Sequence, residues 1–108
     1  MAGTAQAVAL AEGLGLDPGR FLDTIRGGPM DCGYAQMKGA AMIAREFPPA
    51  FTLSGAAKDA GLIVSAMRGA GVNSGVMEAV LAACRAGEEA GHGDKDMAAL
   101  IHSFRPRP

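Results

Sequence analysis

The sequence predicts an all-α protein, a compact bundle of about six helices in one domain that spans residues 1–108. Apolar residues recur at spacings of three and four, and no segment shows the alternation typical of a strand. Glycine and proline interrupt this pattern at intervals that suit short helices. Much of the 49% apolar content is alanine and only 5% of the residues are aromatic, so we expect closely spaced helices rather than a core of bulky rings.

The first half of the chain predicts three helices. An apolar run over residues 3–14 ends at Gly13-Leu14-Gly15, a glycine stop. Asp17-Pro18 predicts an N-cap followed by proline at the first helical position of a short second helix, which ends at Gly27-Gly28-Pro29. A third helix is expected over about residues 32–44.

The second half predicts three more helices. Pro48-Pro49 forces an extended connector, because a residue before proline avoids the α region. Thr52 or Ser54 then caps a fourth helix to about Arg68, and a fifth covers residues 75–90. Asp94 or Asp96 caps a final helix that ends near Ser103.

The first predicted helix is apolar nearly all round, because only Thr4, Gln6 and Glu12 are polar between Ala2 and Leu14. A helix of that kind is usually buried nearly all round. We therefore expect the back half of a longer helix whose outer side faces a second domain or subunit. The alternative is that alanine tolerates solvent and the helix frays.

Composition excludes several classes of function. The net charge is −1 and the basic residues are scattered, which argues against nucleic-acid binding. No run approaches the ~20 apolar residues of a membrane span, and the first residues lack the features of a secretion signal. We therefore expect a cytoplasmic protein.

No metal site is expected. We expect Cys84 to be a buried small residue and Cys32 to lie near a loop. Two cysteines so far apart in the sequence do not suit a disulfide framework or a zinc site. His92 is interpreted as a turn residue near a helix C-terminus, where the partial negative charge suits an imidazolium. His102 is expected on the surface, and neither histidine has companions at metal-ligand spacing.

The candidate site is Phe51 together with the pair Lys58-Asp59. The two prolines anchor the aromatic residue just ahead of the fourth helix, and the charged pair lies among alanine and glycine that would let a ligand approach. Adjacent helical residues point about 100° apart, so Lys58 and Asp59 do not face each other. The alternative is that both are ordinary solvated charges.

These residues carry a family resemblance that covers essentially the whole chain. The chain resembles the C-terminal domain of the β-hydroxyacid dehydrogenases, which include 3-hydroxyisobutyrate dehydrogenase, tartronate semialdehyde reductase and glyoxylate/succinic semialdehyde reductase. The matching segments are residues 7–12, Gly15-Leu16-Asp17, Gly27-Gly28-Pro29-Met30, Phe51-Thr52-Leu53, Lys58-Asp59 and residues 91–96. Individually these segments are weak signals, but their order and spacing together are fairly specific.

The resemblance implies the helical C-terminal domain of a 6-phosphogluconate dehydrogenase-like architecture. In such an enzyme an N-terminal Rossmann domain binds NAD or NADP, and the helical domain closes the active site and forms the homodimer. Lys58 matches a lysine that reaches the cofactor. Asp59 matches a carboxylate, and Phe51 an aromatic residue, at the substrate end of the cleft. The substrate would be a small hydroxyacid or the matching semialdehyde.

The chain also departs from a complete enzyme of that family. It has no Gly-x-Gly-x-x-Gly after a strand, so no dinucleotide cradle is present. The catalytic lysine of the family and its partner asparagine match positions upstream of Met1, and Ala60 stands where relatives often have leucine. We therefore assign no catalytic residue, and we expect the chain alone to be inactive and to bind no cofactor.

Two alternatives remain open. One is a freestanding helical dimerisation or interaction module that pairs through its alanine-rich first helix. The other is a small-ligand binding domain that uses the same cleft without chemistry.

Overall fold

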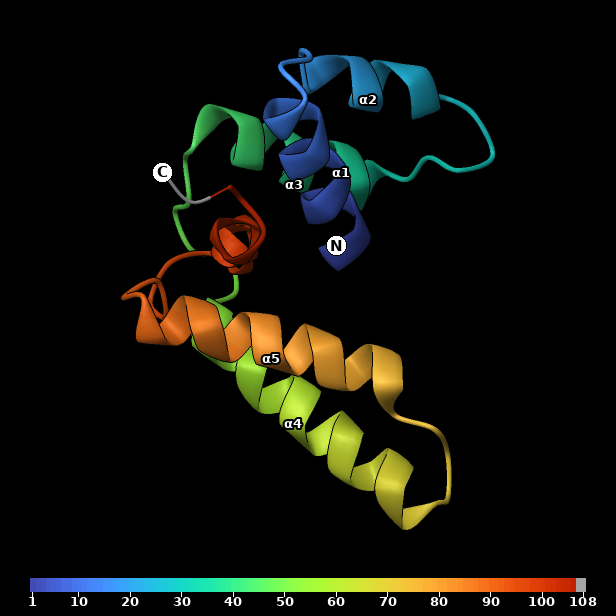
Figure 1. The fold of residues 1–108 in the computed structure, drawn as a ribbon, viewed down its shortest axis with the longest axis vertical. Coiled ribbons are helices and arrows are strands. Elements are labelled where there is room, and N and C mark those ends of the chain that lie inside the picture. The colour runs from blue at the N-terminus through green and yellow to red at the C-terminus, as the bar shows by residue number, and fades with distance from the viewer. Residues whose placement is uncertain (107–108) are drawn as a thin grey trace.

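The computed structural model describes residues 1–106 of the chain, which form five α-helices and one 3₁₀ helix (Figure 1). The only β-pairing among these residues is an isolated antiparallel bridge between Thr52 and Asp96. The all-α prediction is therefore confirmed. The helices are α1 (Ala2–Gly13), α2 (Gly19–Ile25), α3 (Gly33–Ala44), α4 (Leu53–Gly69), α5 (Gly75–Glu89) and η1 (Met97–Ser103).

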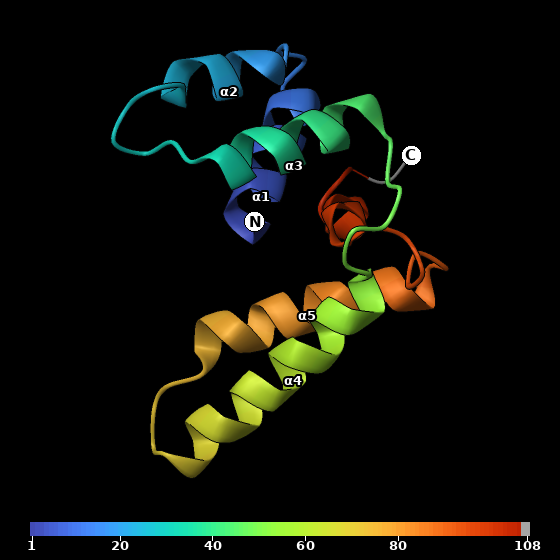
Figure 2. The same ribbon diagram turned by 180° about the vertical axis from the view of Figure 1, so that it is seen from behind.

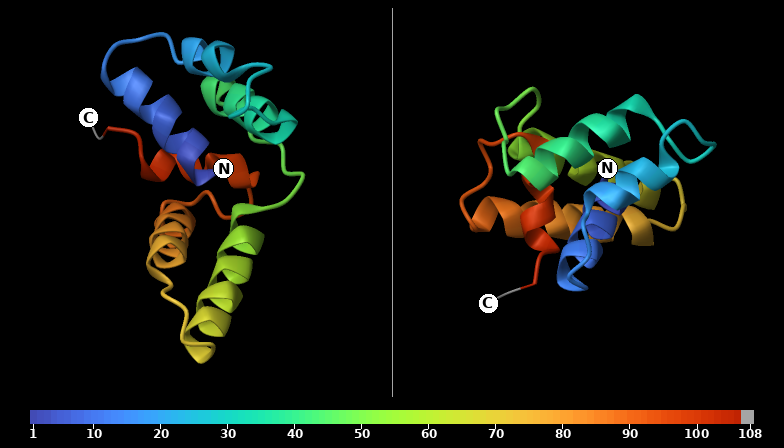
Figure 3. Two further views of the ribbon diagram at one scale, coloured as in Figure 1. Left: turned by 90° about the vertical axis from the view of Figure 1, so that its right-hand side faces the viewer. Right: turned by 90° about the horizontal axis from the view of Figure 1, so that it is seen from above.

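The helices form two groups with η1 between them. The first three helices make one group, and α4 and α5 make an antiparallel hairpin that points away from it (Figures 1 and 2). The 3₁₀ helix contacts α1 and α3 on one side and α4 and α5 on the other, as the turned views in Figure 3 also show. The short η1 element therefore joins the two halves of the molecule.

Side-chain caps fix three of the helix starts. The Cys32 thiol accepts a hydrogen bond from the Ala35 N–H at 3.4 Å, and Thr52 Oγ1 accepts one from the Gly55 N–H at 3.0 Å. At η1, Asp96 Oδ2 accepts from the Ala98 N–H at 2.9 Å. Of the alternatives that the sequence left open, Thr52 and Asp96 are the caps.

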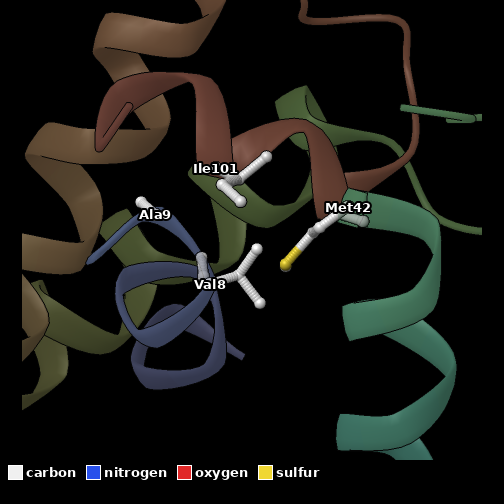
Figure 4. Close-up of a cluster of buried hydrophobic side chains, with 6 residues drawn as sticks. Val8, Ala9, Met42 and Ile101 are labelled. Atoms are coloured by element: carbon white, nitrogen blue, oxygen red, sulfur yellow. The ribbon is translucent and has the colours of Figure 1, made fainter. Parts of the chain in front are cut away.

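The core consists of small clusters between helices. The first joins α1, α3 and η1; Val8, Met42 and Ile101 converge in it, and Ala9 is a further member (Figure 4). The second lies where η1 meets the α4–α5 hairpin. Its buried members are Leu53, Ala57, Ala83, Cys84 and Leu100. The predicted burial of Cys84 is thus confirmed.

The last helix winds as a 3₁₀ helix, a form that the sequence pattern did not predict. A three-residue period places residues i and i+3 above one another. Ala98 and Ile101 therefore both enter the cluster with α1 and α3, while Leu100 enters the cluster with the hairpin. Residues 98–101 are all fully buried, which fits an element covered on both sides.

The first helix is covered on one side only in the single chain. Ala5, Val8 and Ala9 are buried, whereas the Leu10 and Leu14 side chains are 63% and 65% exposed. One side of α1 is therefore open within this chain, as expected for a helix whose outer side faces a second domain or subunit. That a second domain or subunit covers the exposed leucines remains a prediction.

Arg105 fastens the end of the described chain to the first group of helices. Its guanidinium donates to both carboxylate oxygens of Glu12 at 3.0 Å and to the Met42 carbonyl oxygen at 2.7 Å. The hydrogen bond from Arg105 holds the pKa of Glu12 below its usual value. None of the helices among residues 1–106 combines the length and apolar character needed to cross a bilayer.

Candidate functional site

A surface hollow of about 380 Å³ lies where the start of α1 meets α4, α5 and the start of η1. We call it the Phe51 hollow. Its walls are mostly apolar, and Asp59 is the one ionisable side chain on them other than the thiol of Cys84. The residues that line the hollow include Phe51, Ala56, Asp59, Ala60, Met97 and Leu100. Met1, Ala2 and Gly3 border the hollow at the start of α1.

Phe51 is held by its backbone and by a glycine beneath its ring. The Phe51 carbonyl oxygen accepts from the Met97 N–H at 2.8 Å, and the Phe51 N–H donates to Asp96 Oδ1 at 3.4 Å. A Cβ atom on Gly55 would come within 2.9 Å of Phe51 Cζ, so the ring lies directly against the glycine. The side chain is still 45% exposed, which leaves its outer face available for a ligand.

Asp59 and Lys58 take different positions on α4. Asp59 lines the Phe51 hollow, and the small residues Ala56 and Ala60, each within one turn of it on the same helix, leave room around the carboxylate. Lys58 is exposed but does not line the hollow, because adjacent helical residues point about 100° apart. The structure therefore brings Phe51 and Asp59 together and leaves Lys58 on the adjoining surface.

Both charged groups are free to meet a ligand. Among residues 1–106, neither Lys58 nor Asp59 forms an ion pair or a side-chain hydrogen bond with the rest of the chain. An exposed ammonium beside a carboxylate-bearing apolar hollow can pair with an anionic group, while Asp59 can accept from hydroxyl groups. The solvated-charge alternative rests on the same exposure, so exposure by itself does not decide between the two.

A buried ion pair behind the hollow was missed at the level of sequence. Lys38 Nζ donates to Asp96 Oδ2 at 2.8 Å, and the two side chains are only 8% and 5% exposed. Lys38 lies on the same face of the predicted third helix as Tyr34 and Met42, one turn from each. A charged residue in that apolar stripe was the signal that could have revealed the pair.

The environment of Asp96 favours the ionised carboxylate. Burial acts to raise the pKa of Asp96, but hydrogen bonds from Lys38 and from the N–H groups of Ala98, Ala50 and Phe51 outweigh burial and lower it below its usual value. The carboxylate therefore stays charged while almost fully buried.

The two histidines differ from the interpretation made from the sequence. Their rings stack with centroids 4.3 Å apart, and Phe47 meets the His102 ring edge-on at 5.2 Å. Burial lowers the pKa of His102 to about 4, and the His92 ring and the positive charges of Arg105, Lys95 and Arg45 lower it further. His102 is half-buried rather than on the surface, so that expectation was wrong.

His92 lies in the turn after α5, as predicted, but its surroundings do not favour the imidazolium that the helix end was expected to favour. Burial and the Lys95 ammonium lower the pKa of His92. Lys95 Nζ lies 3.0 Å from His92 Nδ1, and because an ammonium can only donate, Nδ1 is the unprotonated acceptor. Within residues 1–106, no group of three or more His, Cys, Asp or Glu side chains is arranged to hold a metal ion.

Comparison with known proteins decides the family. Residues 1–104 match the family described as NAD-binding of NADP-dependent 3-hydroxyisobutyrate dehydrogenase. The chain belongs to this family. The resemblance inferred from residues 7–12, Phe51-Thr52-Leu53 and Lys58-Asp59 is thereby confirmed.

A solved structure gives the same fold. The crystal structure of 3-hydroxyisobutyrate dehydrogenase from Salmonella typhimurium matches with a TM-score of 0.87 at 20% sequence identity. The match covers 95% of this chain and 36% of that chain. The family domain therefore spans little more than a third of the length of that dehydrogenase. None of the curated proteins compared with the chain matches it.

Proposed function

We propose that this chain is the C-terminal domain of an NAD(P)-dependent β-hydroxyacid dehydrogenase of the 3-hydroxyisobutyrate dehydrogenase type. The reaction would interconvert a small hydroxyacid and the matching semialdehyde. The observation that carries this proposal is the convergence of Phe51 and Asp59 on one hollow at the start of α1, in a chain of this family. An apolar wall with a single carboxylate suits a short substrate that has hydroxyl groups to donate.

The residues present fit one edge of a nicotinamide cofactor but not the whole dinucleotide. Lys58 offers an exposed ammonium to a phosphate or ribose group, whereas residues 1–106 contain no strand-turn-helix to cradle the pyrophosphate. The bound cofactor would supply the hydride acceptor or donor. In this proposal Lys58 contacts the cofactor, Asp59 orients the substrate, and Phe51 excludes water from one side of it.

The remaining parts of the enzyme are proposed to come from other segments. A Rossmann domain in a longer parent protein would bind NAD or NADP and provide the catalytic lysine, so this chain alone would be inactive. The 36% coverage of the dehydrogenase from Salmonella typhimurium supports a parent with a further domain. A homodimer and a cytoplasmic location stay predictions.

The test is a kinetic comparison in the longer dehydrogenase that contains this chain. Lys58→Ala is expected to raise KM for the nicotinamide cofactor, and Asp59→Ala to raise KM for the hydroxyacid, each by about ten-fold, because each removes one charged contact. Asp23→Ala is the matched control, since Asp23 is an exposed carboxylate on α2 that pairs only with Arg26 within residues 1–106. Kinetic constants equal to those of the control variant in both cases would exclude this role for the charged pair.

A second candidate function is a helical interaction module without catalysis. The exposed side chains of Leu10 on α1 and of Leu14 just after it favour this alternative. Fluorescence titration with NADPH separates the two, because the longer dehydrogenase is expected to bind the nucleotide while the 108-residue chain is not. A longer protein that neither binds NADPH nor turns over hydroxyacids would support the interaction module.

A further inference from the structure

We propose that Lys38 and Asp96 are positioning residues for Phe51, and that together with Tyr34 they set the shape of the Phe51 hollow from behind. Neither Lys38 nor Asp96 lines that hollow. Both act through residues that do, namely Phe51 and Met97. The consequence for catalysis rests on the proposed function, whereas the positional effect can be measured without it.

The Asp96 carboxylate connects three elements. Its Oδ2 atom accepts from Lys38 Nζ of α3 at 2.8 Å and from the Ala98 N–H of η1 at 2.9 Å. Its Oδ1 atom accepts from the N–H groups of Ala50 and Phe51, in the connector before α4, at 3.1 and 3.4 Å. The backbone at Phe51 is thus tied directly to a buried charge.

Backbone bonds on both sides of the carboxylate complete this attachment. The Asp96 N–H donates to the Phe47 carbonyl oxygen at 3.0 Å, and the Met97 N–H donates to the Phe51 carbonyl oxygen at 2.8 Å. The connector and residues 96–97 therefore form one hydrogen-bonded unit. Because α3 holds this unit through Lys38, a change at Lys38 is expected to reach the ring of Phe51.

Tyr34 gives α3 a second attachment to the same unit. It lies one turn before Lys38 and donates its hydroxyl hydrogen to Met97 Sδ at 3.0 Å. The Lys38 ammonium lies 5.4 Å from the centre of the Tyr34 ring, within the range of a cation–π contact. Two side chains of one helical face thus reach the two consecutive residues Asp96 and Met97.

The charge of Lys38 is the part of this arrangement that specifies position. Four donors converge on one carboxylate, and such hydrogen bonds are strong when the acceptor is ionised. A neutral residue at position 38 removes the only cation paired with Asp96 among residues 1–106. Without its cation, the carboxylate is expected to become hydrated or protonated. Either change weakens the hydrogen bonds that it accepts from the Ala50 and Phe51 N–H groups.

The positional effect is tested by ¹⁹F NMR of the 108-residue chain labelled with 4-fluorophenylalanine. The chain has four phenylalanines, and Phe51→Leu identifies the Phe51 signal by its loss. Lys38→Met is expected to shift or broaden this signal while the Phe21 signal stays in place, and Lys38→Arg is expected to restore it. Arg68→Met is the matched control, because it breaks the exposed pair with Glu78 on the distant hairpin.

A folded Lys38→Met chain with the Phe51 signal unchanged would overturn the inference. Should Lys38→Met fail to fold, Tyr34→Phe decides, because Tyr34 is 44% exposed and its loss leaves the buried pair intact. Tyr34→Phe must then move the Phe51 signal and the ¹³C-methyl signal of Met97, which Met97→Leu identifies. Unmoved signals in that variant would overturn the inference as well.

Kinetics of the longer dehydrogenase separate this inference from the proposed function. Lys38→Met and Phe51→Leu are both expected to raise KM for the hydroxyacid about five-fold with kcat within about two-fold, because each disturbs one wall of the substrate hollow. If Lys38→Met moves the Phe51 signal but Phe51→Leu leaves KM unchanged, the positional inference stands and the proposed function fails. If Phe51→Leu raises KM while Lys38→Met changes neither KM nor the signal, the inference fails and the proposed function stands.

Discussion

Phe51 illustrates how single residues shape the candidate site. Its ring rests on Gly55, and its backbone is tied to Asp96 and Met97. Gly55 and Asp96 do not line the hollow proposed for the substrate, yet both contact Phe51. Substitutions at these supporting residues therefore test the site without altering Phe51 or Asp59.

Gly55→Ala is predicted to displace the Phe51 ring with little loss of stability. The new Cβ atom would lie 2.9 Å from Phe51 Cζ and 3.1 Å from Cε1, closer than carbon atoms can pack. Alanine in place of glycine favours the helix by up to about 1 kcal/mol, which offsets the cost of moving the partly exposed ring. Circular dichroism melting should show a nearly unchanged Tm, while the ¹⁹F signal of Phe51 moves. A Phe51 signal at the wild-type position would contradict this prediction.

Lys38→Met is predicted to destabilise the chain by about 3 kcal/mol or more, because it leaves the Asp96 carboxylate buried without its cation. Urea denaturation followed by circular dichroism measures the loss. Arg68→Met, which breaks an exposed pair, serves as the control and is expected to change the midpoint very little. Adding Asp96→Asn to Lys38→Met should recover part of the loss, since no unpaired charge then remains. Equal midpoints for Lys38→Met and Arg68→Met would contradict the prediction.

At the scale of elements, the turn from α5 to η1 is built on two neutral histidines. His92 and His102 stack on each other, Phe47 closes one edge, and Lys95, Arg45 and Arg105 add positive charge nearby. Protonation of either ring would place another cation in this crowded region. The packing of η1 against the turn is therefore expected to weaken in acid.

The stability of the chain is predicted to fall as the pH drops from about 6.5 toward 4. The pKa of His102 is lowered from 6.5 to about 4, so the folded state favours the neutral ring. The contribution to stability is therefore complete above pH 6.5 and is lost as the pH falls toward 4. We expect a loss of about 1 to 2 kcal/mol between pH 7.5 and 5, a discounted value because the ring is partly open to water. Urea denaturation at the two pH values measures it. His102→Phe should remove most of this dependence, and an unchanged dependence in that variant would contradict the assignment.

At the scale of the whole molecule, the single chain leaves Leu10 on α1 and Leu14 just after it exposed to solvent. Both are more than 60% exposed, whereas Ala5, Val8 and Ala9 on the opposite side of α1 are buried. Leu10, Leu14 and Leu16 line one surface hollow, and adjoining exposed apolar side chains of this kind are typical of an interface. The proposed homodimer and the proposed upstream domain both offer a surface to cover them.

The chain is predicted to form a dimer through this face of α1. Light scattering coupled to size exclusion should give twice the chain mass, and Leu10→Glu should reduce it to the monomer mass because a buried carboxylate opposes association. Val76→Glu is the control, since Val76 is 82% exposed but lies on α5. A monomer for the unmodified chain at high concentration would contradict the prediction.

The sequence by itself determined the local features of this protein. Glycine stops and the three-to-four spacing located all six helices within a few residues, because these signals act between near neighbours in the chain. The predicted cap of the second helix was wrong by one residue, since α2 begins at Gly19 with Pro18 at its N-cap position, and Pro18 provides no side-chain cap. The segments around Phe51 and Lys58-Asp59 also gave the family, and they placed Phe51 and Asp59 on the correct elements.

Only the tertiary structure decided which residues meet. Three features depend on contacts between distant segments of the chain. They are the pairing of Lys38 with Asp96, 58 residues apart, the stacking of His92 on His102, and the 3₁₀ winding of η1. The tertiary structure also places Asp59 in the wall of the Phe51 hollow and Lys58 outside it. Such features follow from how the helices pack around η1, and packing depends on all of their faces at once rather than on any local pattern.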